Sequence, residues 1–195
     1  VYRVIYMENF TGTGTEPTGL YITRQYSELA GKTVAASLFG HGGWTIQGWN
    51  TKEDGSGKSY STGTALEETG ISQDNPTLTL YAIWQRNMYI VVFHPNIPLG
   101  VTYSGMMENL PCTVGDTLTL PENVYRCTGY QFDSWNTKRD GSGTAYSDRT
   151  QVGNGLSQEN GATINLYAQW SVCLHPSEKQ IYRINETKKG LIQTC

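Results

Sequence analysis

Charged residues are scarce in this sequence, and neither sign dominates. They make up 16% of the 195 residues, against about 25% in an average soluble domain. Lysine and arginine together number 14 and aspartate and glutamate 17, which gives a formal charge of −3 at pH 7. Nucleic-acid binding depends on a basic surface that neutralises phosphates. The sequence therefore predicts no nucleic-acid partner.

Long hydrophobic runs are also missing. No apolar stretch approaches the ~18–20 residues that a membrane-spanning helix needs, so no direct membrane insertion of this segment is predicted. The sequence begins at Val1 and shows no signal-peptide pattern there. We therefore expect a fragment or a mature segment, with any targeting or anchoring sequence outside it. How the parent protein is attached stays open at this point.

Cysteine is rare, and its four residues lie late in the chain, at Cys112, Cys127, Cys173 and Cys195. No Cys-x-x-Cys pair is present, so a zinc site is not predicted. Four cysteines allow three pairings, and we favour one that joins Cys112 to Cys127 and Cys173 to Cys195. Paired cysteines would imply an oxidising compartment. Four free buried thiols are the alternative.

Glycine, tyrosine and threonine are plentiful, which suits short strands joined by turns, and the sequence repeats itself. Three segments return at an offset of 86 or 87 residues. In the first and second copy respectively, they are Tyr2–Tyr6 and Tyr89–Phe93, Gly43–Gly57 and Gly129–Gly143, and Leu80–Trp84 and Leu166–Trp170. Self-similarity at a fixed period is typical of repeat proteins. We predict two tandem modules, residues 1–86 and 87–170.

The tail, residues 171–195, has two interpretations. Two short apolar segments separated by Glu186–Gly190 favour a small hairpin. Tyr182–Ile184 also echoes Tyr2–Val4, which would make the tail the start of a third repeat. We favour the hairpin, because Cys195 would then close onto Cys173.

The shared positions within each copy indicate strands and a core. Tyr2, Val4 and Tyr6 alternate along the opening strand, and this period of two marks the buried face. Trp49 and Trp135 are one residue out of phase with the apolar positions before them, so a β-bulge near Gly48 and Ser134 is predicted. The shared tryptophans assigned to the core are Trp49, Trp84, Trp135 and Trp170.

Helical signal is weak. Residues 26–30 and 64–69 are each followed by a glycine, Gly31 and Gly70, so each segment suits one or two helical turns. The predicted class is therefore α+β and mostly β.

The second copy carries the motif Gly-Tyr-x-Phe-x-x-Trp-Asn-Thr-Lys-x-Asp-Gly-Ser-Gly-x-x-Tyr at 129–146, followed by Leu-Tyr-Ala-Gln-Trp at 166–170. This combination resembles the Listeria–Bacteroides repeat, also called the internalin B-repeat family. The first copy departs at Trp44, Gly48 and Ile83 but keeps the frame. The resemblance implies small β-grasp (ubiquitin-like) modules that form arrays on secreted and surface-anchored bacterial proteins.

No catalytic arrangement is apparent. His41, His94 and His175 are far apart in sequence and are not flanked by matched carboxylates, so no catalytic or metal role is predicted for them. The loop 40–43 resembles an oxyanion-hole loop, but no Gly-x-Ser-x-Gly motif accompanies it. The repeated Asp-Gly-Ser-Gly turn, which begins at Asp54 in the first copy, lacks the alternating ligands and final glutamate of a calcium loop. We predict no enzyme, no metal site and no cofactor.

Four tyrosines that the copies do not share are candidates for ligand contact: Tyr21, Tyr26, Tyr103 and Tyr125. Exposed aromatic rings stack on sugars or anchor protein partners, and ordinary packing is the alternative. Our leading hypothesis is a non-catalytic extracellular spacer or adhesion module, attached to a cell surface through a region outside this segment. Its partner would be a surface protein or glycan of a host or neighbouring cell.

Two alternatives remain. One is a protein- or glycan-binding module that uses the variable stretches 8–40 and 94–128. The other is an accessory domain of a larger secreted enzyme.

Overall fold

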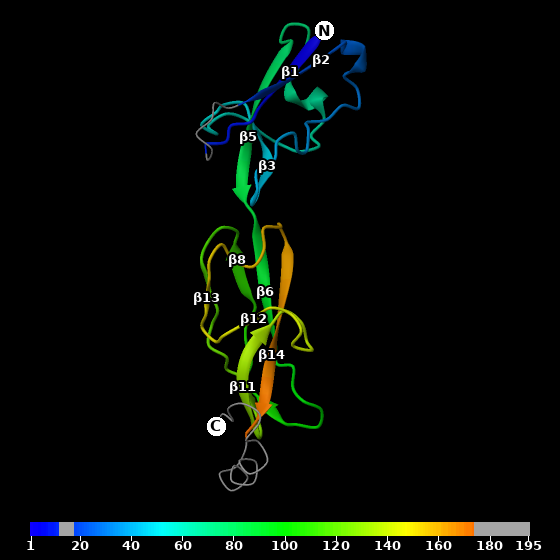
Figure 1. The fold of residues 1–195 in the computed structure, drawn as a ribbon. Helices are drawn as coiled ribbons and strands as arrows, with labels where there is room; N and C mark the ends of the chain where they lie inside the picture. The colour runs from blue at the N-terminus through cyan, green and yellow to red at the C-terminus, as the bar shows by residue number, and fades with distance from the viewer. Residues whose placement is uncertain (12–17, 174–195) are drawn as a thin grey trace. The chain divides into compact units, whose positions relative to one another are not determined.

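The computed structural model of the chain describes residues 1–11 and 18–173 (Figure 1). By its internal contacts the chain divides into two units, Val1–Asn87 and Met88–Cys195. The described residues form strands and two 3₁₀ helices, η1 (Tyr26–Glu28) and η2 (Leu66–Thr69). The predicted hairpin of the tail falls on residues 174–195 and so lies outside the described residues.

The fold is mostly β, as predicted, but the helical part is smaller than the predicted α+β class requires. No α-helix occurs in the described ranges. The two segments with helical signal each form a single 3₁₀ helix of three or four residues. Gly70 ends the second one with a φ of 85°, a left-handed conformation that glycine adopts without steric cost.

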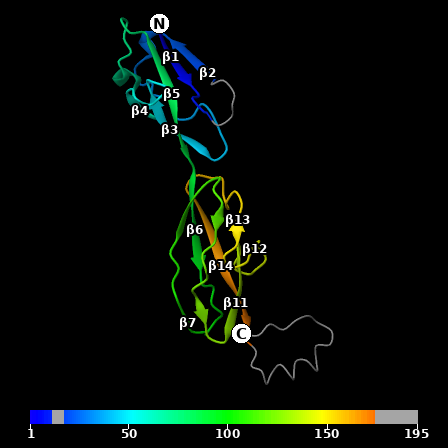
Figure 2. The same cartoon turned by 90° about the vertical axis from the view of Figure 1, so that its left-hand side faces the viewer.

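The first unit contains one five-stranded sheet with the order β2-β1-β5-β3-β4, which can be followed across the unit in Figure 2. Its strands are β1 (Tyr2–Met7), β2 (Gly19–Arg24), β3 (Trp44–Asn50), β4 (Ser59–Ser61) and β5 (Thr77–Arg86). The first and last strands, β1 and β5, are parallel neighbours. All other pairs in this sheet are antiparallel.

The second unit pairs its strands in a corresponding way. β6 and β14 are parallel neighbours, β8 lies beside β6, and β11 lies beside β14 with β12 on its far side. β10 and β7 pair at one end of β11, and β9 and β13 form a separate two-stranded ladder. The bounds are β6 (Met88–His94), β7 (Tyr103–Ser104), β8 (Leu110–Thr113), β9 (Leu118–Thr119), β10 (Arg126–Cys127), β11 (Tyr130–Asn136), β12 (Ala145–Tyr146), β13 (Gln151–Val152) and β14 (Ala162–Val172).

Each unit has its own hydrophobic core. In β1 the alternate residues Tyr2, Val4 and Tyr6 are buried, while Arg3 between them is exposed. Because successive side chains of a strand point to opposite faces, this pattern places one face of the sheet in the core. The corresponding buried residues of β6 are Tyr89, Val91 and Phe93.

A β-bulge in β3 and another in β11 turn a tryptophan into each core. The register with the neighbouring strand shifts between Ile46 and Gly48 and again between Phe132 and Ser134. A bulge adds one residue and so reverses the phase of the residues that follow it. Trp49 and Trp135 consequently have no exposed surface. The bulges lie where the change of phase in the sequence predicts them.

The turn that follows each bulged strand is held by one buried asparagine. Asn50 donates from Nδ2 to the carbonyl oxygens of Gly55 (2.9 Å) and Gly57 (3.2 Å). Its Oδ1 accepts the backbone N–H groups of Lys52 and Gly57, at 2.9 and 3.0 Å. Asn136 makes the same four hydrogen bonds in the second unit, and both asparagines are at most 2% exposed. Both turns therefore depend on this amide.

One buried tyrosine hydroxyl is placed differently in the two cores. In the first unit the Tyr6 hydroxyl accepts the backbone N–H of Ala35, at 3.1 Å. The second unit has Phe93 for Tyr6 and, by the sequence offset, Pro121 for Ala35, so the donor and the acceptor disappear together. The second unit instead has Tyr125, whose hydroxyl donates to the Phe93 carbonyl oxygen at 3.0 Å. These two hydroxyls are paired within their own core, whereas the Tyr2 hydroxyl and Trp135 Nε1 are buried without a hydrogen-bond partner in the described part of the chain.

The predicted disulfide between Cys112 and Cys127 is wrong, because both residues are free buried thiols. Cys112 in β8 pairs with Tyr89, which pairs with Ala162 at the start of β14. Cys127 lies across from Tyr130, which pairs with Val172 at the end of β14. About 33 Å of strand, at ~3.3 Å per residue, separates these two levels, and a disulfide needs Cα atoms within about 7 Å. β8 and β11 indeed lie toward opposite ends of β14 (Figure 1).

The other predicted pair, Cys173 with Cys195, cannot be examined in the same way. Cys173 follows β14, and its backbone N–H donates to the Gly129 carbonyl oxygen at 2.8 Å. Cys195 lies outside the described residues. This pairing stays a prediction.

We expect Asn50→Ala and Asn136→Ala each to lower the free energy of unfolding by about 2–4 kcal/mol, because each removes at least four hydrogen bonds worth ~0.5–1.5 kcal/mol apiece. Asn50 makes a fifth, from Nδ2 to the Ser59 hydroxyl oxygen at 2.9 Å. The matched control is Asp54→Ala in the same turn, whose carboxylate is exposed and accepts the Ser56 N–H at 3.0 Å. The control should cost much less, because water replaces an exposed hydrogen bond readily. Urea unfolding of the three variants measures the difference, and equal losses for Asn50→Ala and Asp54→Ala would contradict this account.

We also expect Cys112 and Cys127 to react slowly with iodoacetamide in the folded chain. Burial raises the pKa of both thiols, so less of the nucleophilic thiolate is present at pH 8, and access is restricted as well. Mass spectrometry after a short exposure should find both residues unmodified, and both alkylated after unfolding in urea. Rapid labelling in the folded state, or a bond between the two, would refute the placement.

Candidate functional site

Four aromatic side chains gather at one corner of the first unit, which we call the aromatic corner: Phe10, His41, Trp44 and Trp84. The Phe10 ring stacks on the His41 ring, with 3.7 Å between centroids. It meets the indoles of Trp44 and Trp84 edge to face, at 5.5 and 5.2 Å. All four residues are half-buried. The corner is therefore a partly exposed aromatic surface and not part of the closed core.

Long-range pairing builds this corner. Trp84 lies near the end of β5 and pairs across β3 with Ile46, two residues after Trp44. Its indole N–H donates to the Glu8 carbonyl oxygen, just after β1, at 2.7 Å. Asn9 then turns the chain with a φ of 50°, a left-handed conformation that asparagine tolerates better than most residues. Phe10 is thereby placed against the end of β5.

One carboxylate joins the corner to the segment beyond it. Glu8 Oε1 lies 2.7 Å from His41 Nε2, and Glu8 Oε2 accepts the Thr18 hydroxyl at 2.9 Å. The Thr18 hydroxyl is the main cause of a lowered pKa at Glu8, and the Thr18 N–H and His41 lower that pKa further, against a rise from burial. Glu8 is accordingly held in its ionised form. No carboxylate flanks His41 in the sequence, and the fold supplies one from 33 residues away.

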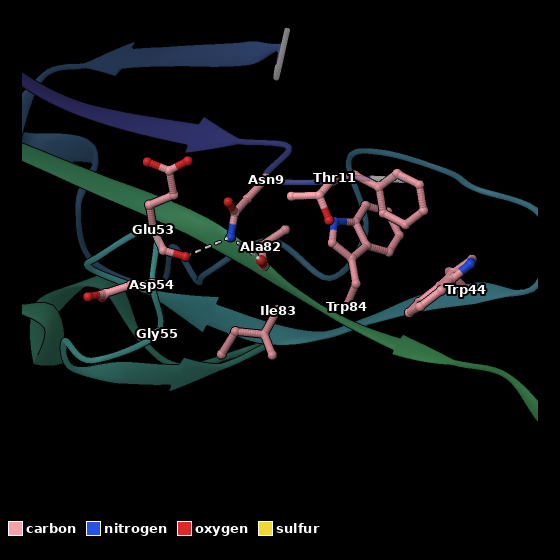
Figure 3. A pocket seen from close by; sticks show the side chains of 10 residues that line it. Asn9, Thr11, Trp44, Glu53, Asp54, Gly55, Ala82, Ile83 and Trp84 are labelled. Atoms are coloured by element: carbon pink, nitrogen blue, oxygen red, sulfur yellow. Dashed lines mark hydrogen bonds between the residues drawn. The ribbon is translucent and has the colours of Figure 1, made fainter. Parts of the chain in front are cut away.

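A pocket of about 470 Å³ opens between the aromatic corner and the turn that Asn50 holds (Figure 3). Asn9, Ala82 and Ile83 form its middle, with Trp84 and Trp44 toward one end and Glu53 and Asp54 at the other. Phe10, Thr11 and Gly55 complete the lining.

Two hydrogen bonds of Asn9 tie the two sides of the pocket together. Asn9 Nδ2 donates to the carbonyl oxygens of Glu53 and Ala82, each at 3.1 Å, and Figure 3 draws both bonds. The pocket is thus built on backbone positions fixed by β5 and the turn.

The polar end of the pocket is acidic. Glu53 and Asp54 are exposed, and the backbone N–H of Ser56 is the main cause of a lowered pKa at Asp54. No lysine or arginine lines the pocket. Aromatic faces beside carboxylates can bind a cation or the hydroxyl and C–H groups of a sugar.

The second unit has the same frame with different side chains. Asn96 repeats the role of Asn9, donating to the carbonyl oxygens of Arg139 (3.0 Å) and Ala168 (2.8 Å). Arg139 stands in place of Glu53, and its Nε donates to Asn96 Oδ1 at 3.2 Å. Gln169 replaces Ile83 and reaches the Arg139 carbonyl oxygen at 3.5 Å. At this corner the second unit therefore has polar side chains bonded to the frame where the first unit has Glu53 and Ile83.

The four candidate tyrosines have different environments. Tyr21 on β2 and Tyr103 on β7 are 67% and 54% exposed. Tyr26 is half-buried; its hydroxyl donates to the Ser72 carbonyl oxygen and its ring packs against Tyr2. Tyr125 is buried and therefore cannot contact a ligand as we expected. The structure brings none of the four to the pocket of the first unit.

The four predicted core tryptophans also divide into two kinds. Trp49 and Trp135 are fully buried, whereas Trp84 and Trp170 are half-buried. Trp170 donates to the Pro95 carbonyl oxygen at 2.7 Å, as Trp84 does to Glu8. Trp84 has a second role, because it lines the pocket.

Of the remaining histidines, His94 is half-buried; its ring stacks on Tyr167 and its Nε2 lies 2.7 Å from Asn165 Oδ1. His175 lies outside the described residues. Within residues 1–11 and 18–173, no three histidine, cysteine, aspartate or glutamate side chains are grouped to hold a metal ion. A helix long and apolar enough to cross a membrane is likewise not found in that part of the chain.

The pocket was missed at the sequence level because its residues come from four separate segments. One signal was present: the repeated turns are nearly identical, yet Glu53 in one becomes Arg139 in the other. A reversal of charge inside a matched motif marks a surface on which the copies differ. The predicted contact residues were all tyrosines, whereas Phe10 and Trp44 line the pocket.

Part of the chain is similar to a known repeat family, and a larger part is similar to two bacterial proteins. Residues 89–169 match the model of the Listeria-Bacteroides repeat domain family. The chain is 34% identical over 136 residues, 67% of its length, to a protein of Evansella cellulosilytica named as a Gly-rich membrane protein. A second protein of that organism, named as a membrane protein, is 34% identical over 112 residues, 53% of the chain. The matches span 14% of the length of each of these relatives.

We expect Thr18→Val to raise the pKa of Glu8 toward its ordinary value of 4.5, because the Thr18 hydroxyl is the main cause of the lowered value. A lowered folded-state pKa contributes stability that is present above the unfolded-state value and is lost as the pH falls through the folded-state value. The stability difference between the native chain and Glu8→Gln should therefore shrink on acidification. Carboxyl NMR titration measures the pKa, and an unchanged value in Thr18→Val would contradict this assignment.

Proposed function

We propose that this chain is a non-catalytic repeat region of a surface protein, in which both units are β-grasp modules of the repeat family that matches residues 89–169. It serves as a spacer that projects other parts of the protein and contributes contacts of its own. The observation that carries this proposal is that the residues common to both copies are used to hold the fold.

The recurring side chains make recurring structural bonds. Asn50 and Asn136 hold the turns, and Trp49 and Trp135 fill the cores. The indoles of Trp84 and Trp170 donate to backbone carbonyl oxygens just after the first strand of each unit. Each of these side chains packs in a core or bonds to the backbone. The repeated part of the sequence thus supports a structural role, and ligand contacts fall to the positions where the copies differ.

The strand order of each unit supports both the β-grasp assignment and the spacer role. The order β2-β1-β5-β3-β4, with the first and last strands parallel at the centre, is the order expected of a β-grasp sheet. The chain enters at the start of β1 and leaves at the end of β5, so entry and exit lie at opposite ends of the pair. Pulling on the two ends then loads the pairing of β1 with β5, from Arg3–Thr77 to Met7–Tyr81, in shear. All of its hydrogen bonds resist the force at the same time. β6 and β14 repeat this geometry.

Surface attachment is supported by the relatives. Both are named as membrane proteins, and both are about seven times longer than the part that matches. We propose that this region likewise belongs to a longer protein attached to a cell envelope and that it lies outside the cell. Tandem modules give such a protein length and, with one site in each copy, multivalent contact.

We expect single-molecule stretching from the two termini to give two separate unfolding peaks, one for each unit. Each peak should release about 25–30 nm of chain, since ~80–85 residues extend by ~3.5 Å apiece. Both forces should exceed the force for the same chain pulled through residues 44 and 86, where tension peels β3 from β5 one bond at a time. A smooth extension without peaks would contradict the spacer role.

A second function, ligand binding by the first unit, is favoured by one observation. The pocket beside the aromatic corner combines aromatic rings and carboxylates on a frame that the second unit shares, where Arg139 and Gln169 instead form hydrogen bonds with that frame. This binding role is independent of the mechanical one.

A further inference from the structure

In the second unit, an arginine side chain lies against the asparagine that both units have at this corner. Asn96 Oδ1 accepts a hydrogen bond from the Arg139 guanidinium, and the Arg139 backbone carbonyl oxygen accepts Asn96 Nδ2. This asparagine, at the corner of the sheet, therefore binds an arginine side chain within its own unit.

The first unit has the same asparagine without the arginine. Asn9 donates to Glu53 and Ala82 as Asn96 does to their counterparts, but no donor among the described residues reaches Asn9 Oδ1. Glu53 occupies the position of Arg139, so the charge at this point is reversed. The pocket of about 470 Å³ opens directly beside it.

We propose that this pocket binds an arginine side chain of a partner polypeptide. The inference rests on the proposed binding role of the first unit and not on the spacer role. The guanidinium donates to Asn9 Oδ1 and faces the carboxylate of Glu53. The partner's arginine thus makes to Asn9 the contact that Arg139 makes to Asn96 within the second unit.

The rest of the lining fits this occupant. Trp84 and Trp44 lie toward the end of the pocket away from Glu53 (Figure 3). These indole faces offer apolar surface to the side-chain stem and to neighbouring residues of the partner polypeptide, while the guanidinium itself lies at the Asn9 and Glu53 end. Ile83 contributes an apolar floor for the methylene stem, as suits a long amphipathic side chain. The acidic end supplies the charge complementarity that selects arginine over a neutral group.

A neutral sugar fits less well. The His41 ring covers one face of the Phe10 ring, so that face is not free as a sugar platform. Both N–H groups of the Asn9 amide are used by backbone carbonyl oxygens, so only acceptor capacity remains toward a ligand. A surface of acceptors and carboxylates favours a ligand with many donors and a positive charge.

The test uses the full chain and a probe peptide, acetyl-Gly-Gly-Arg-Gly-Gly-amide. Binding is followed by NMR through the indole N–H signals of Trp44 and Trp84. The matched neutral probe is the same peptide with citrulline, which keeps the shape of arginine and removes its charge. We expect saturable shifts at the indoles of this pocket with the arginine peptide, and affinity at least about tenfold lower with citrulline.

The matched protein variants are Glu53→Arg and Glu67→Arg. Arginine stands naturally at the position equivalent to Glu53, so Glu53→Arg leaves the turn intact and should weaken peptide binding at least about tenfold. Glu67 is exposed on η2, lies outside the pocket lining and undergoes the same change of charge. The Glu67→Arg chain should bind the peptide as the native chain does.

Three results would overturn the proposal: equal affinity for the citrulline peptide, equal weakening by both variants, or no shift at either indole at millimolar arginine peptide. Saturable binding of a neutral oligosaccharide such as cellotriose at the same indoles, without peptide binding, would assign the pocket to glycans instead. None of these outcomes bears on the unfolding peaks, so failure here and failure of the spacer role are distinguishable.

Discussion

The parallel pairing of the first and last strands is the constraint on which each unit depends. It joins residues about 75 positions apart, as in Val4 with Leu78 and Val91 with Ile164. The strands that follow are added to the two sides of this pair, and the core lies beneath it. The pairing also sets the aromatic corner, because Trp84 at the end of β5 can reach the Glu8 carbonyl oxygen only when β1 lies alongside. The fold of the first unit and its pocket therefore both depend on the pairing of β1 with β5.

A division of labour between shared and unshared residues follows from this frame. The shared residues act mainly through backbone atoms: Asn50 and Asn136 bind main-chain groups, and the Trp84 and Trp170 indoles donate to carbonyl oxygens. Since these partners are backbone atoms, neighbouring side chains can change without loss of the fold. The change of Glu53 to Arg139 reverses a charge on an otherwise constant turn. One scaffold can in this way present an acidic pocket in one unit and, in the other, a corner at which Arg139 and Gln169 bond to the frame.

Much of the local structure could be read from the sequence because it depends on spacing. The one-residue change of phase before Trp49 predicted a bulge, and Gly70 predicted where a helical turn ends. Distances between segments could not be read in this way. Cys112 and Cys127 are fifteen residues apart in sequence, yet the registers of β8 and β10 place them at opposite ends of β14. Tyr125 was a candidate for ligand contact with ordinary packing as the alternative, and the fold buries it, with its hydroxyl on the Phe93 carbonyl oxygen.

The sequence by itself determined the repeat, the alternation of the strands, the inward phase of Trp49 and Trp135 and the turns after them. These features follow from side-chain period and local turn chemistry, which act over a few residues. Only the tertiary structure decided that His41 meets Glu8, that the predicted Cys112–Cys127 bond does not form, and that Asn9, Glu53 and Trp84 surround one pocket. Each of these outcomes depends on the register of strands distant in sequence, and register fixes distance where sequence separation does not.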